Sequence, residues 1–371
     1  MDKMDNKING DKIKELIKKH KLYDCKNLDK FIKSIKTTLP YRGYSGSQFF
    51  INEIDNINFI TKLNFYRKDA PELYGVTTPG TMSQNRAEIR ILDILKKEIL
   101  EKKISPCIIE QIYVHDCKSF NEIETSEKKC DEYRHSISND LHEIIHGLFC
   151  KQFDLIKEGL SNDGFTFVAL ERSDITLRTY LNNYFPENII AMSILKSLLF
   201  QIIFTIYKIK KKYPSFAHND LHTDNIMLKY DYDFNFNPMN IKYIIYKDSL
   251  THWAIPYFGI IPKIIDFGFS IISELGVVSN VVDNKTMMYY RPDNDILFLL
   301  YDIYDVTLDP NVVKLFTKLD PTDFFINYDI KYTRDHPEKV PTYKQMLYND
   351  VWKEYKNLEV TPSQKIYEFG E

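Results

Sequence analysis

The spacing of hydrophobic residues predicts helices at the start and near the middle of the chain. Ile13, Leu16 and Ile17 recur at intervals that place them on one helix face, and a second such face follows before residue 38. Residues 189–209 are almost continuously apolar, but polar residues, including a lysine, interrupt them. A membrane span is therefore a poor interpretation. We expect a helix buried in a protein core instead.

Shorter apolar runs predict strands between these helices. Residues 58–65 combine β-branched and aromatic residues with a single lysine, Lys62. Residues 107–114 and 165–171 have a similar composition. Residues 86–95 follow the period of an amphipathic helix instead. The pattern thus predicts strands and helices within the same half of the chain.

The composition is typical of a soluble globular protein. The 371 residues are 44% hydrophobic and 27% charged, and the formal net charge is -3. This length allows about two domains or lobes. The small net charge gives no strong case for binding to nucleic acid or to a membrane. Residues 1–38 are lysine-rich and could touch nucleic acid or an acidic partner, but we favour a basic helical extension that packs on the first lobe.

The cysteines and histidines raise the question of a metal site. The five cysteines form no C-x-x-C pair and the N-terminus is charged, which together predict a reducing intracellular compartment. His142, His146 and Cys150 repeat every four residues and could bind zinc from one helix face. Because no C-x-x-C pair accompanies them, we favour an inserted helical segment at about residues 115–160.

Two polar loops, each beside an apolar run, carry the candidate chemistry. Residues 216–228 read FAHNDLHTDNIML and contain Asp220 five residues before Asn225. A later run, residues 263–268, ends in Asp-Phe-Gly, beginning at Asp266. Phosphoryl transfer needs a carboxylate that accepts the proton of the attacking hydroxyl, and oxygen ligands that hold metal ions on the phosphates. The two loops together predict phosphoryl transfer.

The order H-x-D-L-x-x-x-N followed by D-F-G resembles the catalytic and metal-binding loops of the protein-kinase-like superfamily. The variant H-x-D-L-H-x-x-N looks most like haspin-type and other divergent kinases, including a large-DNA-virus type. It is also similar to small-molecule kinases of the aminoglycoside and choline phosphotransferase group. The resemblance implies an α+β, bilobal fold with a β-rich N-lobe (residues 39–172) and a mainly helical, reduced C-lobe (residues 173–371). A second insertion is expected at about residues 229–261.

The resemblance also implies roles for residues of the two loops. Asp220 would be the catalytic base, and Asn225 and Asp266 would hold Mg²⁺. His222 stands where most serine/threonine kinases have a lysine that meets the transferred phosphate, and it could do so by a hydrogen bond. These four residues and Lys62 are the expected catalytic group.

Further candidates would bind ATP from outside the two loops. Lys62 would hold the α- and β-phosphates, and Glu88, on the helix at residues 86–95, would orient Lys62 through an ion pair. The family's glutamate stands nearer its lysine, so Glu98 and Glu101 remain alternatives.

The remaining ATP contacts are expected from backbone groups. Gly43 and Gly46 form a partial match to the glycine-rich loop of kinases, in which backbone N–H groups approach phosphates. Adenine would bond to backbone groups near Leu170, Glu171 and Arg172.

Two further positions bear on how the loop is held and regulated. Asp295, or alternatively Asp293, resembles the family's buried helix aspartate, which hydrogen-bonds the backbone of the catalytic loop. Asn219 stands where regulated kinases have the arginine that pairs with a phosphorylated activation segment, and no A-P-E triplet closes that segment. We therefore hypothesise that no activating phosphorylation is needed.

The expected function is that of a divergent, atypical serine/threonine protein kinase that uses ATP and Mg²⁺ and has a protein substrate. Two alternatives remain: a small-molecule kinase, and a nucleotide-binding pseudokinase. The expected location is intracellular, in the host's or its own cytoplasm, or in a virion if the protein is viral.

Overall fold

The computed structural model divides the chain into two compact units. The first comprises residues 1–76 and 110–172, and the second comprises residues 77–109 and 173–371. The structure describes residues 10–26, 28–39, 47–67, 84–118, 130, 141–159, 161–185, 190–249, 251–278, 294–320 and 340–370. Both strands and helices build the described residues, so the predicted α+β class is confirmed.

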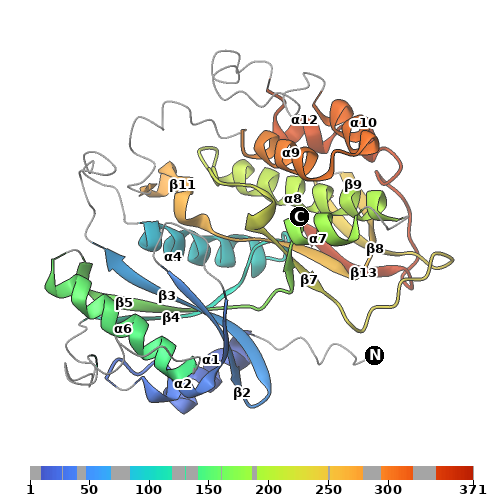
Figure 1. The fold of residues 1–371 in the computed structure, drawn as a ribbon. Coiled ribbons are helices and arrows are strands. Elements are labelled where there is room, and N and C mark those ends of the chain that lie inside the picture. The colour runs from blue at the N-terminus through green and yellow to red at the C-terminus, as the bar shows by residue number, and fades with distance from the viewer. Residues whose placement is uncertain are drawn as a thin grey trace. The chain divides into compact units, whose positions relative to one another are not determined.

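An antiparallel five-stranded sheet, in the order β1-β2-β3-β5-β4, forms the first unit. Its strands are Ile35–Leu39 (β1), Gln48–Ile54 (β2), Ile57–Arg67 (β3), Gln111–Cys117 (β4) and Ser161–Leu170 (β5) (Figure 1). Asp55 and Asn56 join β2 to β3 and both have a positive φ, as a two-residue hairpin turn requires. The strands predicted at residues 58–65 and 165–171 are confirmed.

The two faces of this sheet bury different side chains. Phe59 and Leu63 of β3 face a hydrophobic core together with Phe50 of β2 and Phe167 of β5. Because successive strand residues point to opposite faces, Lys62 lies on the other face. It is only 3% exposed there.

Three helices cover the core face of the sheet: Gly10–His20 (α1), Asp29–Ser34 (α2) and Leu141–Lys157 (α6). Phe31 of α2 is fully buried, and its ring centroid lies 4.9 Å from that of Phe167 and 5.4 Å from that of Phe50. Ile13 of α1 and Phe149 of α6 join the same core. Helices are thus present at Gly10–His20 and Asp29–Ser34 of the predicted extension, and both pack on this sheet.

The sequence analysis misplaced two boundaries in this unit. The extension was predicted to stay helical to residue 38, but Ile35–Leu39 pairs with β2 as an edge strand. A strand was predicted at residues 107–114, but β4 begins at Gln111 and continues to Cys117. His115 and Cys117 therefore belong to the sheet, outside the inserted helical segment.

Four of the five cysteines form disulfides, which the sequence analysis did not foresee. Cys25 pairs with Cys117, Cys130 pairs with Cys150, and Cys107 is free and buried. The expectation of unpaired thiols, on which the intracellular prediction partly rested, is corrected for these four residues, and the compartment itself stays a prediction. Since Cys150 is bonded, it is not available as the zinc ligand considered above.

Helix α8, Ala191–Lys212, forms the core of the second unit. Among the described residues, it alone is long and apolar enough to cross a membrane, by length and composition, but 78% of its most apolar window is buried inside the structure. Phe200 packs against Tyr246 and Trp253, with ring centroids 5.7 and 5.6 Å away. The prediction of a buried core helix is confirmed.

Other helices of the second unit surround α8 or carry the site. They are Gln84–Leu95 (α4), Leu177–Tyr184 (α7), Asn294–Thr307 (α9), Pro310–Leu319 (α10) and Tyr343–Leu347 (α12). The amphipathic helix predicted at residues 86–95 is confirmed as α4, and a π-helical turn, Lys96–Leu100, extends it.

Three small sheets complete the second unit. Their strands are Ile175–Thr176 (β6), Ile226–Tyr230 (β7), Lys242–Asp248 (β8), Thr251–Tyr257 (β9), Ile260–Ile264 (β10), Ile271–Ile272 (β11), Val277–Val278 (β12) and Lys365–Gly370 (β13). One sheet has the order β10-β7-β6, a second pairs β11 with β12, and the third has the order β13-β8-β9.

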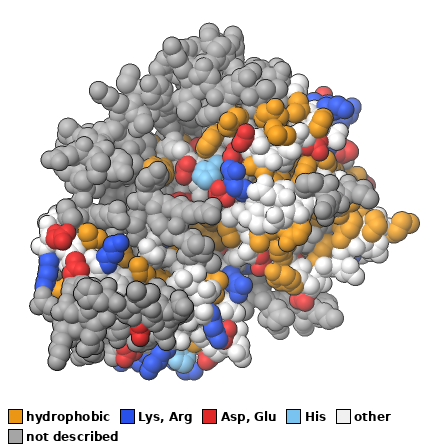
Figure 2. Space-filling view, in the orientation of Figure 1, with side chains coloured by type: hydrophobic (Ala, Val, Ile, Leu, Met, Phe, Trp, Pro, Cys, Tyr) orange, Lys and Arg blue, Asp and Glu red, His pale blue; other side chains and the backbone are white. Residues whose placement is uncertain are grey.

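The hairpin predicted within residues 229–261 is confirmed as β8–β9, but its third strand was not expected. β13 pairs with β8 in the parallel direction. Gly370 has a φ of 96°, and a Cβ there would lie 2.1 Å from the carbonyl oxygen of Lys247, so only glycine fits. On the face shown in Figure 2, hydrophobic side chains are exposed among charged ones. Among the large hydrophobic side chains of the described residues, those of Met239, Tyr232 and Leu308 are the most exposed.

Candidate active site

A short antiparallel ladder brings the two predicted loops together within the second unit. β7 pairs with β10 so that Ile226 lies opposite Ile264. The N–H of Ile265 donates to the carbonyl oxygen of Asn225 over 3.0 Å. Since Asn225 directly precedes β7 and Asp266 follows β10, both residues lie at the same end of the ladder. The second unit thus assembles the two predicted metal ligands.

Asp220 and Asn225 are joined by hydrogen bonds. Nδ2 of Asn225 donates to Oδ2 of Asp220 over 2.9 Å and to its carbonyl oxygen over 2.8 Å. These bonds orient the Asn225 amide, and no described residue donates to its Oδ1. The Asp220 side chain is 32% exposed, so its carboxylate is both oriented and open to solvent. This is the geometry expected of a base that receives a proton from a bound hydroxyl.

His222 lies beside this pair. Its Nε2 is 3.6 Å from Oδ1 of Asp220 and 3.1 Å from Nδ2 of Asn225. Burial alone would lower the pKa of His222, but the carboxylates of Asp220, Asp302 and Asp224 together outweigh burial, so the pKa is raised. Conversely, burial alone would raise the pKa of Asp220, but His222 and the other neighbours lower it. The carboxylate is therefore ionised at neutral pH.

Asp266 has a constrained backbone conformation. Its φ of 57° and ψ of 68° place a non-glycine residue in the left-handed region, which is uncommon. The side chain is half-buried, and among the described residues its carboxylate makes no hydrogen bond. The carboxylate of Asp266 and Oδ1 of Asn225 therefore offer oxygen atoms to which no described residue donates, and oxygen is the ligand that Mg²⁺ prefers.

Asp295, near the start of α9, holds the first half of the predicted catalytic loop, residues 218–225. Its Oδ2 accepts from the N–H of His218 over 2.7 Å, and its Oδ1 accepts from the N–H of Asn219 over 2.8 Å. Burial raises the pKa of this carboxyl, against the opposing effect of His218 and the two N–H groups. The predicted contact of Asp295 with the loop backbone is confirmed, whereas Asp293 lies outside the described residues.

Asp302, two turns further along α9, holds the second half of the loop, and the sequence analysis missed it. Its Oδ2 accepts from the N–H of Thr223 over 2.7 Å, and its Oδ1 accepts from Nη2 of Arg178 over 2.6 Å. Nε of Arg178 also donates to Oδ2 of Asp224 over 2.8 Å. The signal was present in the sequence, because residues seven apart, such as Asp295 and Asp302, share a helix face.

His218 and Asn219 connect the loop to the segment that follows β10. Nε2 of the buried His218 is 2.9 Å from the carbonyl oxygen of Ile265, so the prediction that His218 packs and hydrogen-bonds is confirmed. Asn219 has a φ of 63°, and its Nδ2 donates to the carbonyl oxygen of Phe269 over 2.8 Å. Oγ of Ser270 donates to the carbonyl oxygen of His218 over 3.1 Å. Both ends of the Asp-Phe-Gly segment are thereby tied to the catalytic loop.

Helix α4 also belongs to the second unit and packs against the Asp-Phe-Gly segment. Nη2 of Arg90 lies 3.3 Å from the carbonyl oxygen of Leu275, to which it donates. Glu88 is 5% exposed and lies among buried Ile91 and Leu92, as the helix period predicted. Glu88 and Lys62 lie in different units, so their ion pair stays a prediction, as do the alternatives Glu98 and Glu101.

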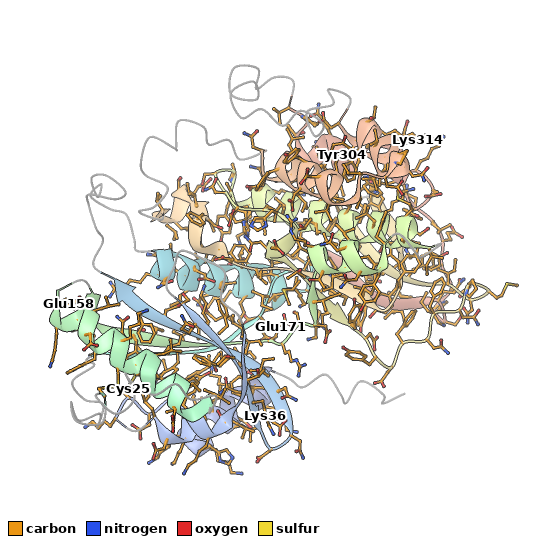
Figure 3. The ribbon with its side chains drawn as sticks, in the orientation of Figure 1. Cys25, Lys36, Glu158, Glu171, Tyr304 and Lys314 are labelled. Carbon is orange, nitrogen blue, oxygen red and sulfur yellow. A yellow bond between two sulfur atoms is a disulfide. The ribbon has the colours of Figure 1, made fainter. Side chains whose placement is uncertain are left out.

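The predicted ATP contacts of the first unit are placed only in part. Lys62 lies on β3, with Nζ 5.3 Å from the ring centroid of Phe49. Leu170 ends β5, and Glu171, labelled in Figure 3, follows it. The N–H of Glu171 already donates to the carbonyl oxygen of Glu110 over 3.0 Å. A hydrogen bond between adenine and the backbone here would therefore need other groups, such as those of Arg172.

Some predicted residues lie outside the described part of the chain. Gly43 and Gly46 fall within residues 40–46, and most of the predicted activation segment falls within residues 279–293. Their roles stay predictions.

Sequence comparison finds relatives that bear kinase names. A protein of Acanthamoeba polyphaga mimivirus, provisionally named a serine/threonine-protein kinase, is 27% identical over 304 residues, which are 76% of this chain and 73% of that protein. A second mimivirus protein with this provisional name is 26% identical over 280 residues, 70% of this chain and 53% of that protein. A Dictyostelium discoideum protein, also provisionally named a serine/threonine-protein kinase, is 33% identical over 143 residues, 36% of this chain and 10% of that protein. No protein-family model matches the chain.

Among solved structures, WaaP in complex with acyl carrier protein is similar, with a TM-score of 0.38 and 11% identity over 86% of this chain and 92% of that chain. This TM-score is too low to support any conclusion about the fold or function of this chain. The sequence relatives support a phosphotransferase of the kinase superfamily and leave its acceptor open. The likeness to haspin-type kinases stays a prediction.

Proposed function

We propose that this relative of the mimivirus proteins is an ATP-dependent phosphotransferase, and specifically a divergent serine/threonine protein kinase. The observation that carries the proposal is the Asp220–Asn225 hydrogen-bonded pair, which the β7–β10 ladder places at the same end as Asp266. A base and two metal ligands of the types that phosphoryl transfer needs thus come from one short ladder and its two loops.

In this proposal, Asp220 orients the acceptor hydroxyl and accepts its proton. The carboxylate is suited to this because it is ionised, partly exposed and held by the Asn225 amide. His222, whose Nε2 lies 3.6 Å from Oδ1 of Asp220, donates a hydrogen bond to the transferred phosphate. Because Asp295 and Asp302 fix the loop backbone before substrate binds, positioning contributes much of the rate enhancement.

Asn225 would hold Mg²⁺ through its Oδ1 and Asp266 through its carboxylate, to which no described residue donates. When bound, the ion would neutralise charge on the phosphates of ATP. Lys62 would hold the α- and β-phosphates from the first unit, with Glu88 as its proposed partner, Gly43 and Gly46 near the phosphates, and the backbone after Leu170 near adenine.

A protein hydroxyl is the proposed acceptor. The names of the mimivirus relatives favour it, since both are provisionally assigned to the serine/threonine-protein kinases. The histidine at position 222 and the absence of an A-P-E triplet after the Asp-Phe-Gly run favour the second candidate, a small-molecule kinase. The proposed setting is intracellular.

We also propose that activity needs no phosphorylation of the activation segment. Asn219 bonds directly to the carbonyl oxygen of Phe269, a tie that in regulated kinases depends on an arginine and a phosphate. Ser270 is fully buried and donates to His218, so it is unsuited to modification. Full activity of unphosphorylated protein would support this, and activation by a second kinase would contradict it.

Phosphate transfer from labelled Mg-ATP tests the proposed function. The acceptors are the protein itself, a generic basic protein and a generic acidic protein. Asp220→Asn is compared with the wild type and with Asp233→Asn, a matched change at an exposed position. We expect labelling of serine or threonine by the wild type and the control, and a loss of about 10²–10⁴-fold in Asp220→Asn.

Other outcomes separate the alternatives. ATP turnover that needs Asp220 but labels no protein would indicate a small-molecule acceptor. Nucleotide binding without turnover would indicate a pseudokinase, and a ligand at one hundred times its Kd raises stability by about 2.7 kcal/mol, which a thermal melt detects. Equal activity in Asp220→Asn and wild type would contradict the proposed base.

A further inference from the structure

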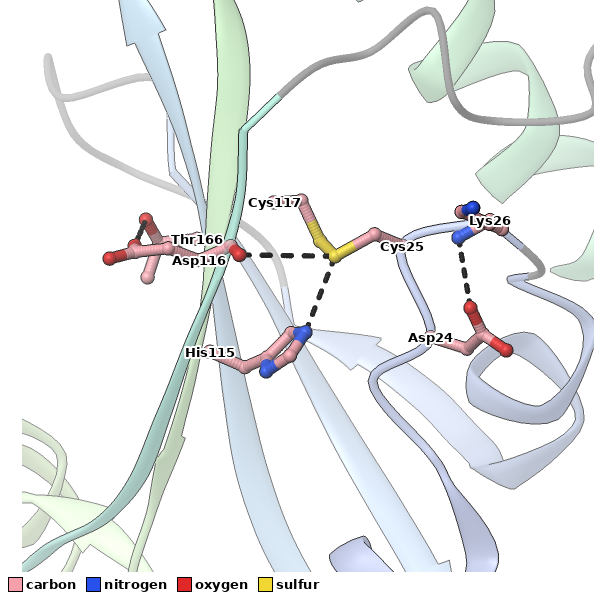
Figure 4. The surroundings of a disulfide bond; sticks show 7 residues. All are labelled: Asp24, Cys25, Lys26, His115, Asp116, Cys117 and Thr166. Atoms are coloured by element: carbon pink, nitrogen blue, oxygen red, sulfur yellow. Dashed lines mark hydrogen bonds between the residues drawn. A yellow bond between two sulfur atoms is a disulfide. The ribbon is translucent and has the colours of Figure 1, made fainter.

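Cys25, His115 and Cys117 form a cluster in the first unit, remote in sequence from the residues of the proposed chemistry. One ligand atom from each residue lies within 4.8 Å of the other two. Nε2 of His115 is 3.3 Å from Sγ of Cys25, and Cys25 forms a disulfide with Cys117 (Figure 4). Two sulfur atoms and an imidazole nitrogen are the ligand types that zinc prefers.

The strand geometry explains why these three side chains meet. His115 and Cys117 are two residues apart on β4, so they point to the same face of the sheet. This is the face covered by α1 and α2, and Cys25 lies in the loop between those helices. Asp116 points to the opposite face, where its Oδ1 accepts from Oγ1 of Thr166 over 2.5 Å, so it does not belong to the cluster.

We propose that this cluster is a redox-dependent zinc site, with a disulfide in its oxidised state and a Zn²⁺ ion in its reduced state. In a tetrahedral site with zinc–sulfur bonds of about 2.3 Å and zinc–nitrogen bonds of about 2.0 Å, ligand atoms lie roughly 3.5–3.8 Å apart. The separation between Nε2 of His115 and Sγ of Cys25 is already close to that range. Reduction frees the two sulfur atoms to move apart, and a water molecule fills the fourth position.

A phosphine reductant and one water convert the disulfide to two thiols and are themselves converted to the phosphine oxide. Zn²⁺ then binds both sulfur atoms as thiolates and displaces two protons. Oxidation of the two thiolates by a disulfide oxidant removes two electrons, re-forms the bond between Cys25 and Cys117, and releases Zn²⁺.

Either state ties the N-terminal helices to the sheet that carries Lys62. Tyr23, two residues before Cys25, stacks on Phe167 with ring centroids 4.5 Å apart. Its hydroxyl lies 2.8 Å from Oγ1 of Thr61, the neighbour of Lys62 on β3. The site therefore anchors the segment that supports this part of β3, and each redox state provides its own anchor.

Zinc titration of the full chain tests the proposal. The protein is reduced with a phosphine, freed of excess reductant, and titrated with Zn²⁺ against a chromophoric chelator. We expect about one Zn²⁺ per reduced chain, none for the oxidised chain, and affinity at least about tenfold weaker in Cys25→Ser and His115→Ala. The matched control combines Cys130→Ser with Cys150→Ser, which removes the other disulfide and should leave zinc binding unchanged.

A second measurement does not depend on the variants being folded. Co²⁺ added to the reduced wild type should give thiolate-to-cobalt charge-transfer bands, together with the visible bands of a tetrahedral site. Failure of the reduced wild type to bind Zn²⁺, or a Co²⁺ spectrum without thiolate bands, would overturn the proposal and leave a structural disulfide. Zinc binding that is lost in the Cys130 and Cys150 control, but kept in His115→Ala, would overturn it as well.

Discussion

The catalytic loop of the second unit and the sheet of the first unit hold their functional side chains by different physical means. Two carboxylates of α9, Asp295 and Asp302, accept hydrogen bonds from backbone N–H groups of the loop. Lys62, by contrast, is positioned by the alternation of β3 and by a hydrophobic core on the opposite face of the sheet. One region is fixed by a few directed bonds, and the other by many undirected contacts.

Because of this difference, substitutions in the two regions should affect stability and activity to different extents. A hydrogen bond to a loop backbone fixes a few atoms, so its loss moves the catalytic groups before it unfolds the unit. Core packing involves many residues at once, so its loss lowers the stability of the entire unit before it changes the chemistry. Substitutions that loosen the loop should therefore lower activity more than stability, and substitutions in the core should lower stability more than activity.

Phe31→Ala should give the largest effect, and on stability alone. Phe31 is fully buried and packs against Tyr23, Phe50 and Phe167. Truncation should lower the free energy of unfolding by about 3–5 kcal/mol. Denaturant unfolding measures this loss, and Phe31→Leu, which keeps more of the volume, should lose less. A fall in kcat per folded molecule would show that the core also controls the chemistry.

Lys62→Met should lower activity more than stability, although Lys62 lies in the same unit as Phe31. Removal of a phosphate-binding cation should lower kcat/KM by roughly 10²–10³-fold. The melting temperature should fall less than in Phe31→Ala, because removal of the buried ammonium relieves its desolvation penalty, although it also leaves the proposed partner Glu88 without a counter-charge. Lys30→Met, at an exposed position on α2, is the matched control. A large drop in melting temperature would mean that Lys62 supports the sheet and would weaken its proposed role.

Asp302→Asn should affect kcat more than stability. Asparagine keeps one acceptor oxygen, but the loss of charge weakens the bonds to Thr223 and Arg178. We expect kcat to fall about 10–10²-fold with KM for ATP nearly unchanged, because the loop shifts while the ATP contacts remain. Asp305→Asn, exposed on the same helix, should match the wild type. An equal loss of kcat in both variants would show that Asp302 does not position the loop.

The pH dependence should show the smallest effect. The pKa of His222 is raised above its ordinary value of 6.5, so the imidazole stays protonated to a higher pH than usual and loses its proton as the pH rises through the raised pKa. The rate should fall by about fivefold across that range, since a charged hydrogen bond becomes a neutral one. His222→Asn should remove this alkaline limb. If the limb persists in the variant, it belongs to another group.

The sequence predicted best those features that lie close together along the chain. The apolar period identified α4 and α8, and the motif around Asp220 identified the loop, because each signal lies within about twenty residues. Asp295 was also found, through the resemblance to kinases.

The features that were missed depend on long-range pairing. β13 pairs with a strand more than a hundred residues earlier, and its six residues show no clear burial period. The spacing of the cysteines does not specify which of them pair. Asp302 was missed because its partners, Thr223 and Arg178, lie 79 and 124 residues away along the chain, so no local pattern links them to it.

The position of β13 in the chain affects how the protein is made on the ribosome. β8 and β9 are translated first and can pair at once, but the other edge of β8 stays open until residues 365–370 emerge. That edge includes Ile244, Ile245 and Tyr246, a β-prone run able to pair with a strand of another nascent chain. Slower translation of residues 249–364 would lengthen this exposure, and a chaperone that shields strand edges would raise the yield of folded protein.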